Sequence, residues 1–330
     1  MIFSPAILAL FVGSLITTGL LLAAAFFGVQ ILRYWDLNSG SELQLKLERQ
    51  TYLISTFVAY AFAFELLSLF LFIYTVDHLH TFFVGAMCAA GSLNANSWGY
   101  PVIIFRMVNF LLAGIWLIVN YTDNKGYDYP LIRMKYVLLL VIAPVILGET
   151  IIQAYYFFGL EPEVITSCCG ALFSAQGASV AADIIAFPRV PLEIIYTATM
   201  LLLLGWGIFS YRTGRGKYVF TASAFLAFLI AMVSFISFIS IYIYELPTHH
   251  CPFCVLQQEY FFIGYLYYLT LLAGTITGLG VGILNPYRQT ASLQGIIPGI
   301  QQKLILATLI FFGSFTALAV FQIVWSNLKM

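Results

Sequence analysis

Charge is what this sequence has least of. Only 8% of its 330 residues are charged, whereas 62% are hydrophobic; an average soluble domain is roughly a quarter charged. The fourteen basic and fourteen acidic residues cancel, so no positive field would attract nucleic acid. The sequence has no Gly-x-x-x-x-Gly-Lys-Ser/Thr loop for phosphate binding. These absences exclude nucleic-acid binding and an internal ATPase, and they predict a polytopic membrane protein.

The apolar residues are gathered into long runs. A helix needs about 20 apolar residues to cross a hydrocarbon core of roughly 30 Å. Met1 to Ser4 carry no positive charge, so we expect the first run to be a retained helix and not a signal peptide. The predicted fold class is all-α, a single transmembrane domain over residues 1–330 with eight membrane helices at about 5–32, 51–75, 101–121, 136–158, 191–211, 218–244, 260–284 and 304–325.

The distribution of Lys and Arg predicts the orientation of these helices, because short cytoplasmic loops keep the positive charge. Eleven of the fourteen basic residues flank alternate connections between the runs, and only Arg189 and Lys329 lie on the other side, with Arg106 inside a run. We therefore expect a bacterial-type cytoplasmic membrane protein with both termini outside. The eleven residues are Arg33, Lys46, Arg49, Lys125, Arg133, Lys135, Arg212, Arg215, Lys217, Arg288 and Lys303.

On this map, every cysteine and histidine falls in the outward connections 76–100, 159–190 and 245–259. Cysteines scattered as small buried hydrophobic residues would rarely all avoid the helix interiors. The outer face is thus predicted to carry the chemistry. The residues concerned are His78, His80, Cys88, Cys168, Cys169, His249, His250, Cys251 and Cys254.

The cysteines also recur at a regular spacing. Cys88 and Cys169 are 81 residues apart, and Cys169 and Cys251 are 82 apart. Two interpretations fit this regularity. The chain consists of tandem helix pairs, or it shows only the rough periodicity that any series of helix pairs has.

The most specific motif is Cys251-Pro252-Phe253-Cys254, which precedes an apolar run. Two thiols one turn apart at the start of a helix can form a disulfide, and the helix N-terminus favours the thiolate. A c-type haem would need histidine directly after the second cysteine. Val255 occupies that position, which disfavours such a haem.

The run from Cys251 to Gln257, leading into an outward-starting helix, resembles the Cys-x-x-Cys segment of the DsbB family of quinone-linked disulfide-generating membrane proteins, and more loosely the vitamin K epoxide reductases. The resemblance covers about a dozen residues. It implies a redox pair at the outer surface, a bound quinone near Gln257, and a second external pair that exchanges with a periplasmic thioredoxin-like partner.

Cys168 and Cys169 are adjacent, and a disulfide between neighbours is strained and easily reduced. We consider three interpretations: pairing with a distant cysteine such as Cys88, metal ligation, or two small residues in a tight turn before Gly170. If one of the two adjacent cysteines pairs with Cys88, the other is free to act as an attacking thiol.

Four histidines lie at predicted helix ends and could serve as ligands. Imidazole and thiolate together suit Zn, Cu or Fe, but no single connection has a complete four-ligand spacing, so a metal site would have to be assembled between connections. The alternatives are interfacial polar residues and axial ligands of a haem b. The candidate ligands are His78, His80, His249 and His250, with all five cysteines as alternatives.

Three ionisable residues, Glu65, Arg106 and Glu149, lie inside predicted membrane helices, where charge is costly and usually faces a polar path or a partner. They predict either a proton path to the outer face or an interhelical ion pair. In addition, the small-residue segment 85–99 is predicted to dip into the membrane as a re-entrant turn. That turn would carry Cys88, and would offer Asn94 and Asn96 to a quinone head or a metal.

The leading functional hypothesis is a thiol–disulfide oxidoreductase that acts at the outer face. Cys251 and Cys254 would form the redox pair, and Cys88, Cys168 and Cys169 would be exchange partners. One alternative is a transporter or assembly factor for a soft metal. Another is a non-catalytic membrane subunit of an electron-transfer complex. The expected partners are the lipid bilayer and a periplasmic thioredoxin-like protein, a cytochrome or a metal carrier.

Overall fold

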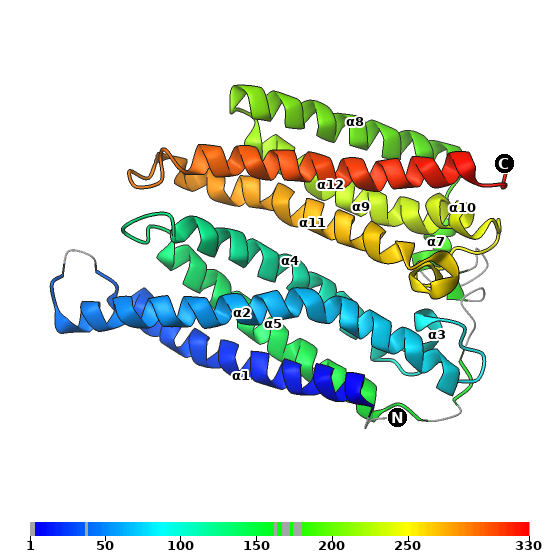
Figure 1. Cartoon of the computed structure of the whole chain (residues 1–330), viewed down its shortest axis with the longest axis horizontal. Helices are drawn as coiled ribbons and strands as arrows, with labels where there is room; N and C mark the ends of the chain where they lie inside the picture. The colour runs from blue at the N-terminus through cyan, green and yellow to red at the C-terminus, as the bar shows by residue number, and fades with distance from the viewer. Residues whose placement is uncertain (1–3, 37–38, 162–163, 167–171, 174–179, 330) are drawn as a thin grey trace. The chain divides into compact units, whose positions relative to one another are not determined.

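The computed structural model describes residues 4–36, 39–161, 164–166, 172–173 and 180–329, and these are almost entirely helical (Figure 1). Eight helical segments in this part of the chain are long and apolar enough to cross a membrane, as the sequence predicted. They are Pro5–Tyr34, Glu42–Phe82, Gly99–Asp123, Ile132–Phe158, Arg189–Thr213, Lys217–Tyr244, Ile263–Gln289 and Ile297–Trp325.

These segments are formed by α1 (Pro5–Tyr34), α2 (Glu42–His78) with η1 (Leu79–Phe82), α4 (Gly99–Asp123), α5 (Ile132–Phe158), α8 (Arg189–Thr213), α9 (Lys217–Ser234) with η2 (Phe235–Ile239) and α10 (Ser240–Tyr244), α11 (Ile263–Leu284) with η5 (Asn285–Gln289), and α12 (Ile297–Trp325). Shorter helices are α3 (Ala89–Leu93), α7 (Val180–Ala186), η3 (Cys254–Leu256) and η4 (Gln258–Tyr260).

The helices group into two compact units. Unit 1 comprises Met1–Thr75, Asn96–Leu160 and Pro286–Ile300, and unit 2 comprises Val76–Ala95, Glu161–Asn285 and Gln301–Met330. Within unit 1, α1 packs on α5 and α5 on α4; within unit 2, α8 and α11 both pack on α9. The single transmembrane domain, the outside location of the termini and the helix-pair repeats stay predictions.

The second membrane helix starts nine residues before its predicted boundary at residue 51. The nine added residues, Glu42 to Gln50, include four charged side chains, so hydropathy alone places the start of the helix too late in the sequence. Ser41 caps this end, because its hydroxyl accepts a hydrogen bond from the backbone N–H of Gln44 at 3.3 Å. At 1.5 Å per residue, the 41-residue segment is about 60 Å long and extends well beyond a hydrocarbon core.

Unit 1 is held together by an apolar core and a buried ion pair. Trp116 and Tyr136 are almost completely buried in this core. Lys135 Nζ lies 2.7 Å from Asp123 Oδ2, and both side chains are fully buried. Asp123 also accepts a hydrogen bond from the backbone N–H of Leu131 at 2.8 Å. Asp123 at the end of α4 therefore contacts both Lys135 on α5 and the backbone of the connecting turn, and these contacts fix the turn.

Unit 2 depends on close helix contact through glycine. A Cβ atom at Gly278 would lie 2.5 Å from the Cβ of Ala224, and one at Gly282 would lie 2.6 Å from the hydroxyl of Thr221. Small residues at four-residue spacing let helix backbones approach closely in a membrane, where packing takes the place of the hydrophobic effect. Gly278 and Gly282 thus place α11 directly against α9.

We expect Gly278→Ala to lower the free energy of unfolding of the full chain by about 1–3 kcal/mol, because the added methyl overlaps Ala224. Gly205→Ala is a matched control, since a Cβ there meets nothing within 4 Å. It should leave stability unchanged or raise it slightly, because alanine is the better helix former. Denaturant titration in detergent measures both, and equal effects of the two changes would contradict this packing.

Candidate three-cysteine site

The site begins where α2 ends, at a turn of unit 2 that carries Cys88. Asp77 Oδ1 accepts a hydrogen bond from the backbone N–H of Ala89 at 2.9 Å. Cys88 is the residue before α3 and is completely buried, as are Ala89 and Ala90. The re-entrant segment predicted for residues 85–99 thus contains a buried turn, and Asp77 fixes its position.

Gly85 marks the close approach of a second connection to this turn. Its φ is +86°, and a Cβ there would lie 2.6 Å from the carbonyl oxygen of Thr166. The backbone of Val84 bonds to Val164 and Thr166, and Val84 forms an isolated parallel bridge with Ile165. Val164 to Thr166 therefore lie beside the Cys88 turn in unit 2.

The segment Cys251 to Leu256 also lies against the Cys88 turn. Two tyrosines hold its backbone. Tyr244 donates to the carbonyl of Cys251 at 2.5 Å and accepts from the N–H of Val255 at 2.8 Å, and Tyr268 donates to the carbonyl of Pro252 at 2.5 Å. Because each phenol satisfies backbone groups that are buried, the two tyrosines fix the conformation of the loop.

Gln257 joins the two segments. Its Nε2 donates to the carbonyl oxygen of Met87 at 2.8 Å and to Asp77 Oδ1 at 3.4 Å. One carboxylate oxygen therefore receives hydrogen bonds from both cysteine-bearing segments. The sequence singled out Gln257 as a cofactor ligand; in the structure its amide connects backbone and carboxylate within the site.

The result is a compact group of sulfurs. Cys88 Sγ lies 3.6 Å from Cys251 Sγ, although the residues are 163 positions apart in the sequence. The three Sγ atoms of Cys88, Cys251 and Cys254 all lie within 4.8 Å of one another. Cys88 and Cys251 are fully buried, and Cys254 is 5% exposed. Such distances permit a disulfide after small side-chain rotations and permit three thiolates around one ion.

Contrary to the sequence prediction, the Cys-x-x-Cys pair does not precede the membrane helix directly. Cys254 starts only the three-residue helix η3, and the membrane helix α11 begins at Ile263. The two thiols therefore do not lie at the N-terminus of the long membrane helix, and the prediction that this helix favours their thiolates is wrong. Instead, the backbone N–H of Phe253 points to Cys251 Sγ at 3.4 Å and can stabilise a thiolate locally.

The four histidines take other positions. His78 is exposed, and Nδ1 of His80 hydrogen-bonds to the carbonyl of Asp77. The ring of His249 packs edge-on against Tyr244 at 4.5 Å. His250 Nδ1 lies 3.2 Å from the carbonyl of Ile236, within the π-helical turn η2. In the described part of the chain, the metal-capable group contains the three cysteines and none of these histidines.

Burial lowers the pKa of His250 below its ordinary value, although hydrogen bonds to backbone carbonyls oppose this shift. The ring is therefore neutral at pH 7. With Nδ1 hydrogen-bonded to a carbonyl, the proton of the neutral ring is on Nδ1 and the lone pair on Nε2. His250 adjoins Cys251 in the sequence and adds no positive charge to the site at neutral pH.

The remaining predicted residues are divided between the units. Asn94 is half-buried in unit 2. Asn96 belongs to unit 1, where it donates to the carbonyl of Tyr156 at 2.9 Å and lines a cavity of about 680 Å³ with Trp98 and Tyr155. Glu65, Arg106 and Glu149 are also in unit 1. The predictions for Cys168 and Cys169 lie outside the described residues.

Sequence reasoning missed the residues that organise the site, Asp77, Tyr244 and Tyr268. Asp77 has a sequence signal, since it is an acidic residue at the end of an apolar run, directly before His78. The two tyrosines have none, because the chain contains 21 tyrosines, and neither the end of an apolar run, where Tyr244 lies, nor the inside of one, where Tyr268 lies, sets these two apart from the others.

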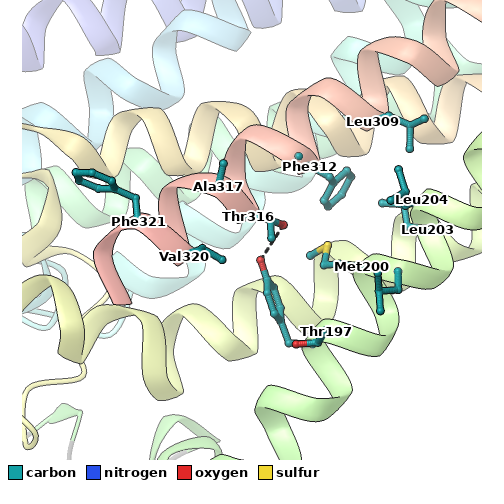
Figure 2. Close-up of a pocket in the computed structure, with 13 residues that line it drawn as sticks. Thr197, Met200, Leu203, Leu204, Leu309, Phe312, Thr316, Ala317, Val320 and Phe321 are labelled. Atoms are coloured by element: carbon teal, nitrogen blue, oxygen red, sulfur yellow. Dashed lines mark hydrogen bonds between the residues drawn. The ribbon is translucent and has the colours of Figure 1, made fainter. Parts of the chain in front are cut away.

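Unit 2 also has an apolar groove between α8 and α12, with a volume of about 660 Å³ (Figure 2). Inside it, the hydroxyl groups of Tyr196 and Thr316 share a hydrogen bond of 3.0 Å, in which either can be the donor, and Figure 2 shows the Thr316 end of this bond. Leu203, Leu309 and Phe312 line its walls. In a bilayer we expect acyl chains to fill a groove of this composition, and it contains no charged group.

Comparison of the chain with protein-family models, with curated proteins and with solved structures finds no match. The class that the fold and the site define is therefore a multi-pass helical membrane protein with a buried cluster of three cysteines.

Proposed function

We propose that this chain is a membrane thiol–disulfide oxidoreductase whose reacting groups are Cys88, Cys251 and Cys254. The observation that carries the proposal is the 3.6 Å separation of Cys88 Sγ and Cys251 Sγ, with Cys254 Sγ within 4.8 Å of both. A Cys-x-x-Cys pair with a third thiol in reach has the parts needed for internal disulfide exchange. The resemblance of residues 251–257 to the DsbB-type segment supports the same chemistry.

The exchange step conserves electrons. With Cys251 and Cys254 joined as a disulfide, the Cys88 thiolate attacks Cys251 Sγ, and Cys254 leaves as a thiolate. The product is a Cys88–Cys251 disulfide. Net oxidation of a substrate dithiol gives two electrons and two protons to the protein disulfide, and a quinone that becomes a quinol is the acceptor class we propose for regenerating it.

The proposed site faces the outside of a bacterial-type cytoplasmic membrane. The turn after α2 and the loop before α11 both join helix ends on the side that carries few Lys and Arg residues. An oxidising compartment is where stable disulfide chemistry occurs. The proposed substrate is a periplasmic thioredoxin-like dithiol, and the termini would lie on the same side.

A soft-metal site is the second candidate, and the same three sulfurs favour it. Among the described residues the metal-capable group holds three buried cysteines and no histidine, and three thiolates suit Cu(I) better than Zn, which usually takes four ligands. In that case the chain would capture and pass on a copper ion. Disulfide formation and metal binding compete for the same thiols, so the two functions predict opposite results in one experiment.

Differential thiol trapping of the purified, detergent-solubilised wild-type chain distinguishes them. For the oxidoreductase, we expect incubation with an oxidised dithiol to yield a disulfide peptide containing Cys251, reversed by dithiothreitol, with no stoichiometric metal. Mass spectrometry of alkylated peptides and elemental analysis give both readouts. Permanently reduced Cys88, Cys251 and Cys254 with about one Cu per chain would overturn the oxidoreductase and support metal handling.

A further inference from the structure

Unit 1 contains a charged cluster inside its membrane helices that the thiol chemistry of unit 2 does not use. Glu65 on α2, Arg106 on α4 and Glu149 on α5 are 4%, 2% and 1% exposed. Ionisable groups at such positions are rare and usually serve a substrate, an ion or a proton. An ion pair alone would need only two of the three residues.

The contacts within the cluster are unequal. Arg106 Nη2 lies 3.3 Å from Glu149 Oε1, and Asn109 donates a hydrogen bond to the same carboxyl group. Glu65 receives no direct bond from the guanidinium among the described contacts. Arg106 Nη1 donates to the hydroxyl of Ser68 at 2.8 Å, and that hydroxyl lies 3.3 Å from Glu65 Oε2.

The charge count identifies the carboxyl group that holds a proton. One guanidinium neutralises one carboxylate, and a second buried carboxylate would leave a net negative charge in a low-dielectric site. Glu149 has the ion pair and the amide donor, so Glu149 is the carboxylate. Glu65, which has only the hydroxyl of Ser68, keeps its proton when the cluster is neutral.

Unpartnered polar atoms beside the cluster support exchange of this proton. Asn109 Oδ1 and Gln153 Nε2 are buried and have no hydrogen-bond partner in the described part of the chain, although Asn109 Nδ2 contacts Glu149 and Gln153 Oε1 contacts Arg106. One is an acceptor and the other a donor. A water molecule, which is both, satisfies such a pair and can relay a proton.

We propose that Glu65 is a proton-binding site that takes up and releases one proton, with the Arg106–Glu149 pair setting its affinity. In the protonated state the cluster is neutral; release leaves a Glu65 carboxylate beside Arg106 and passes the proton to water. The charged groups acting on Glu65 are Arg106 and Glu149. The neutral polar groups of the cluster are Ser14 on α1, Ser68 on α2, Asn109 on α4, and Gln153 on α5.

Labelling with dicyclohexylcarbodiimide tests the proposal, because this reagent modifies protonated carboxyl groups in apolar surroundings. In the full chain reconstituted in lipid vesicles, we expect modification of Glu65 and not of Glu149, and we expect it to decrease as the pH rises. Glu149→Gln should reduce labelling of Glu65 by about tenfold or more, because Arg106 then pairs with Glu65 and stabilises its carboxylate. Peptide mass spectrometry measures the modified fraction.

Two controls keep this test decisive. Glu42→Gln changes an exposed glutamate at the start of α2 and should leave labelling of Glu65 unchanged. Infrared spectroscopy of the wild-type chain should show a protonated carboxyl band that shifts in D₂O and is absent in Glu65→Gln. Labelling of Glu65 that is independent of both pH and Glu149→Gln, or a carboxyl band that persists in Glu65→Gln, would overturn the proposal.

Discussion

Cys251→Ser should abolish both disulfides of the proposed exchange, Cys88–Cys251 and Cys251–Cys254, whereas Cys88→Ser and Cys254→Ser should each leave one of them able to form. Cys251 is the sulfur shared by the Cys-x-x-Cys pair and by the 3.6 Å contact with Cys88. Removing it takes away both proposed disulfides. Because electrons cannot pass between the cysteines by the proposed exchange without Cys251, we expect substrate oxidation to fall to background.

The measurement is the rate at which each purified variant oxidises a reduced thioredoxin-like dithiol in the presence of a quinone. Trapped disulfide peptides are quantified in parallel. Cys88→Ser should retain the Cys251–Cys254 disulfide, and Cys254→Ser should accumulate the Cys88–Cys251 disulfide, because its resolving thiol is missing. A Cys251→Ser chain that oxidises substrate as fast as the wild type would remove the three-cysteine site from the mechanism.

Arg106→Leu is expected to lower the free energy of unfolding by about 3–5 kcal/mol, the cost of leaving a buried partner charge uncompensated. Arg106 touches Glu149 and Ser68 and stacks over the ring of Phe72 at 4.7 Å. The double variant Arg106→Leu, Glu149→Gln should recover most of the loss, because it removes both charges.

Arg189→Gln is the matched control for this change. Arg189 also pairs with a glutamate, Glu193, at 2.6 Å, but the two side chains are 28% and 36% exposed. A half-buried pair that water reaches on this scale contributes about 0–1 kcal/mol, although Arg189 also donates a hydrogen bond to the hydroxyl of Tyr242. Denaturant titrations in mixed micelles compare the variants. If Arg106→Leu and Arg189→Gln had equal effects, burial would not be what makes the Arg106 pair important.

The cysteine cluster shows how far the sequence could lead. Charge asymmetry and the positions of Cys88 and Cys251 in outward connections predicted that they belong to one face. The sequence could not predict which sulfurs meet, because contacts between residues 163 positions apart depend on how the turn after α2 packs against the loop before α11 and not on local pattern. Asp77, which fixes the Cys88 turn, and Tyr244, which fixes the Cys251 loop, act through backbone groups that leave no motif.

The charged cluster of unit 1, Glu65, Arg106 and Glu149, also shows what the sequence could predict and what it could not. Hydropathy identified them as ionisable residues inside membrane helices, and an interhelical ion pair was one of the two expectations for them. The structure confirms the ion pair between Arg106 and Glu149. Among the described contacts, Glu65 is joined to Arg106 through the hydroxyl of Ser68. This arrangement cannot be read from the spacing of charged residues.

By itself, the sequence determined the eight apolar helices, because the requirement to satisfy every backbone hydrogen bond across a membrane leaves a long apolar run little choice but to be helical. It also determined which residues carry reactive or ionisable groups. Only the tertiary structure decided that Cys88, Cys251 and Cys254 meet, that their group contains no histidine of the described chain, and that the membrane helix begins at Ile263 and not at the cysteines. The physical reason is that helix formation is a local property of the chain, whereas a site depends on how the side chains of distant helices and turns pack together.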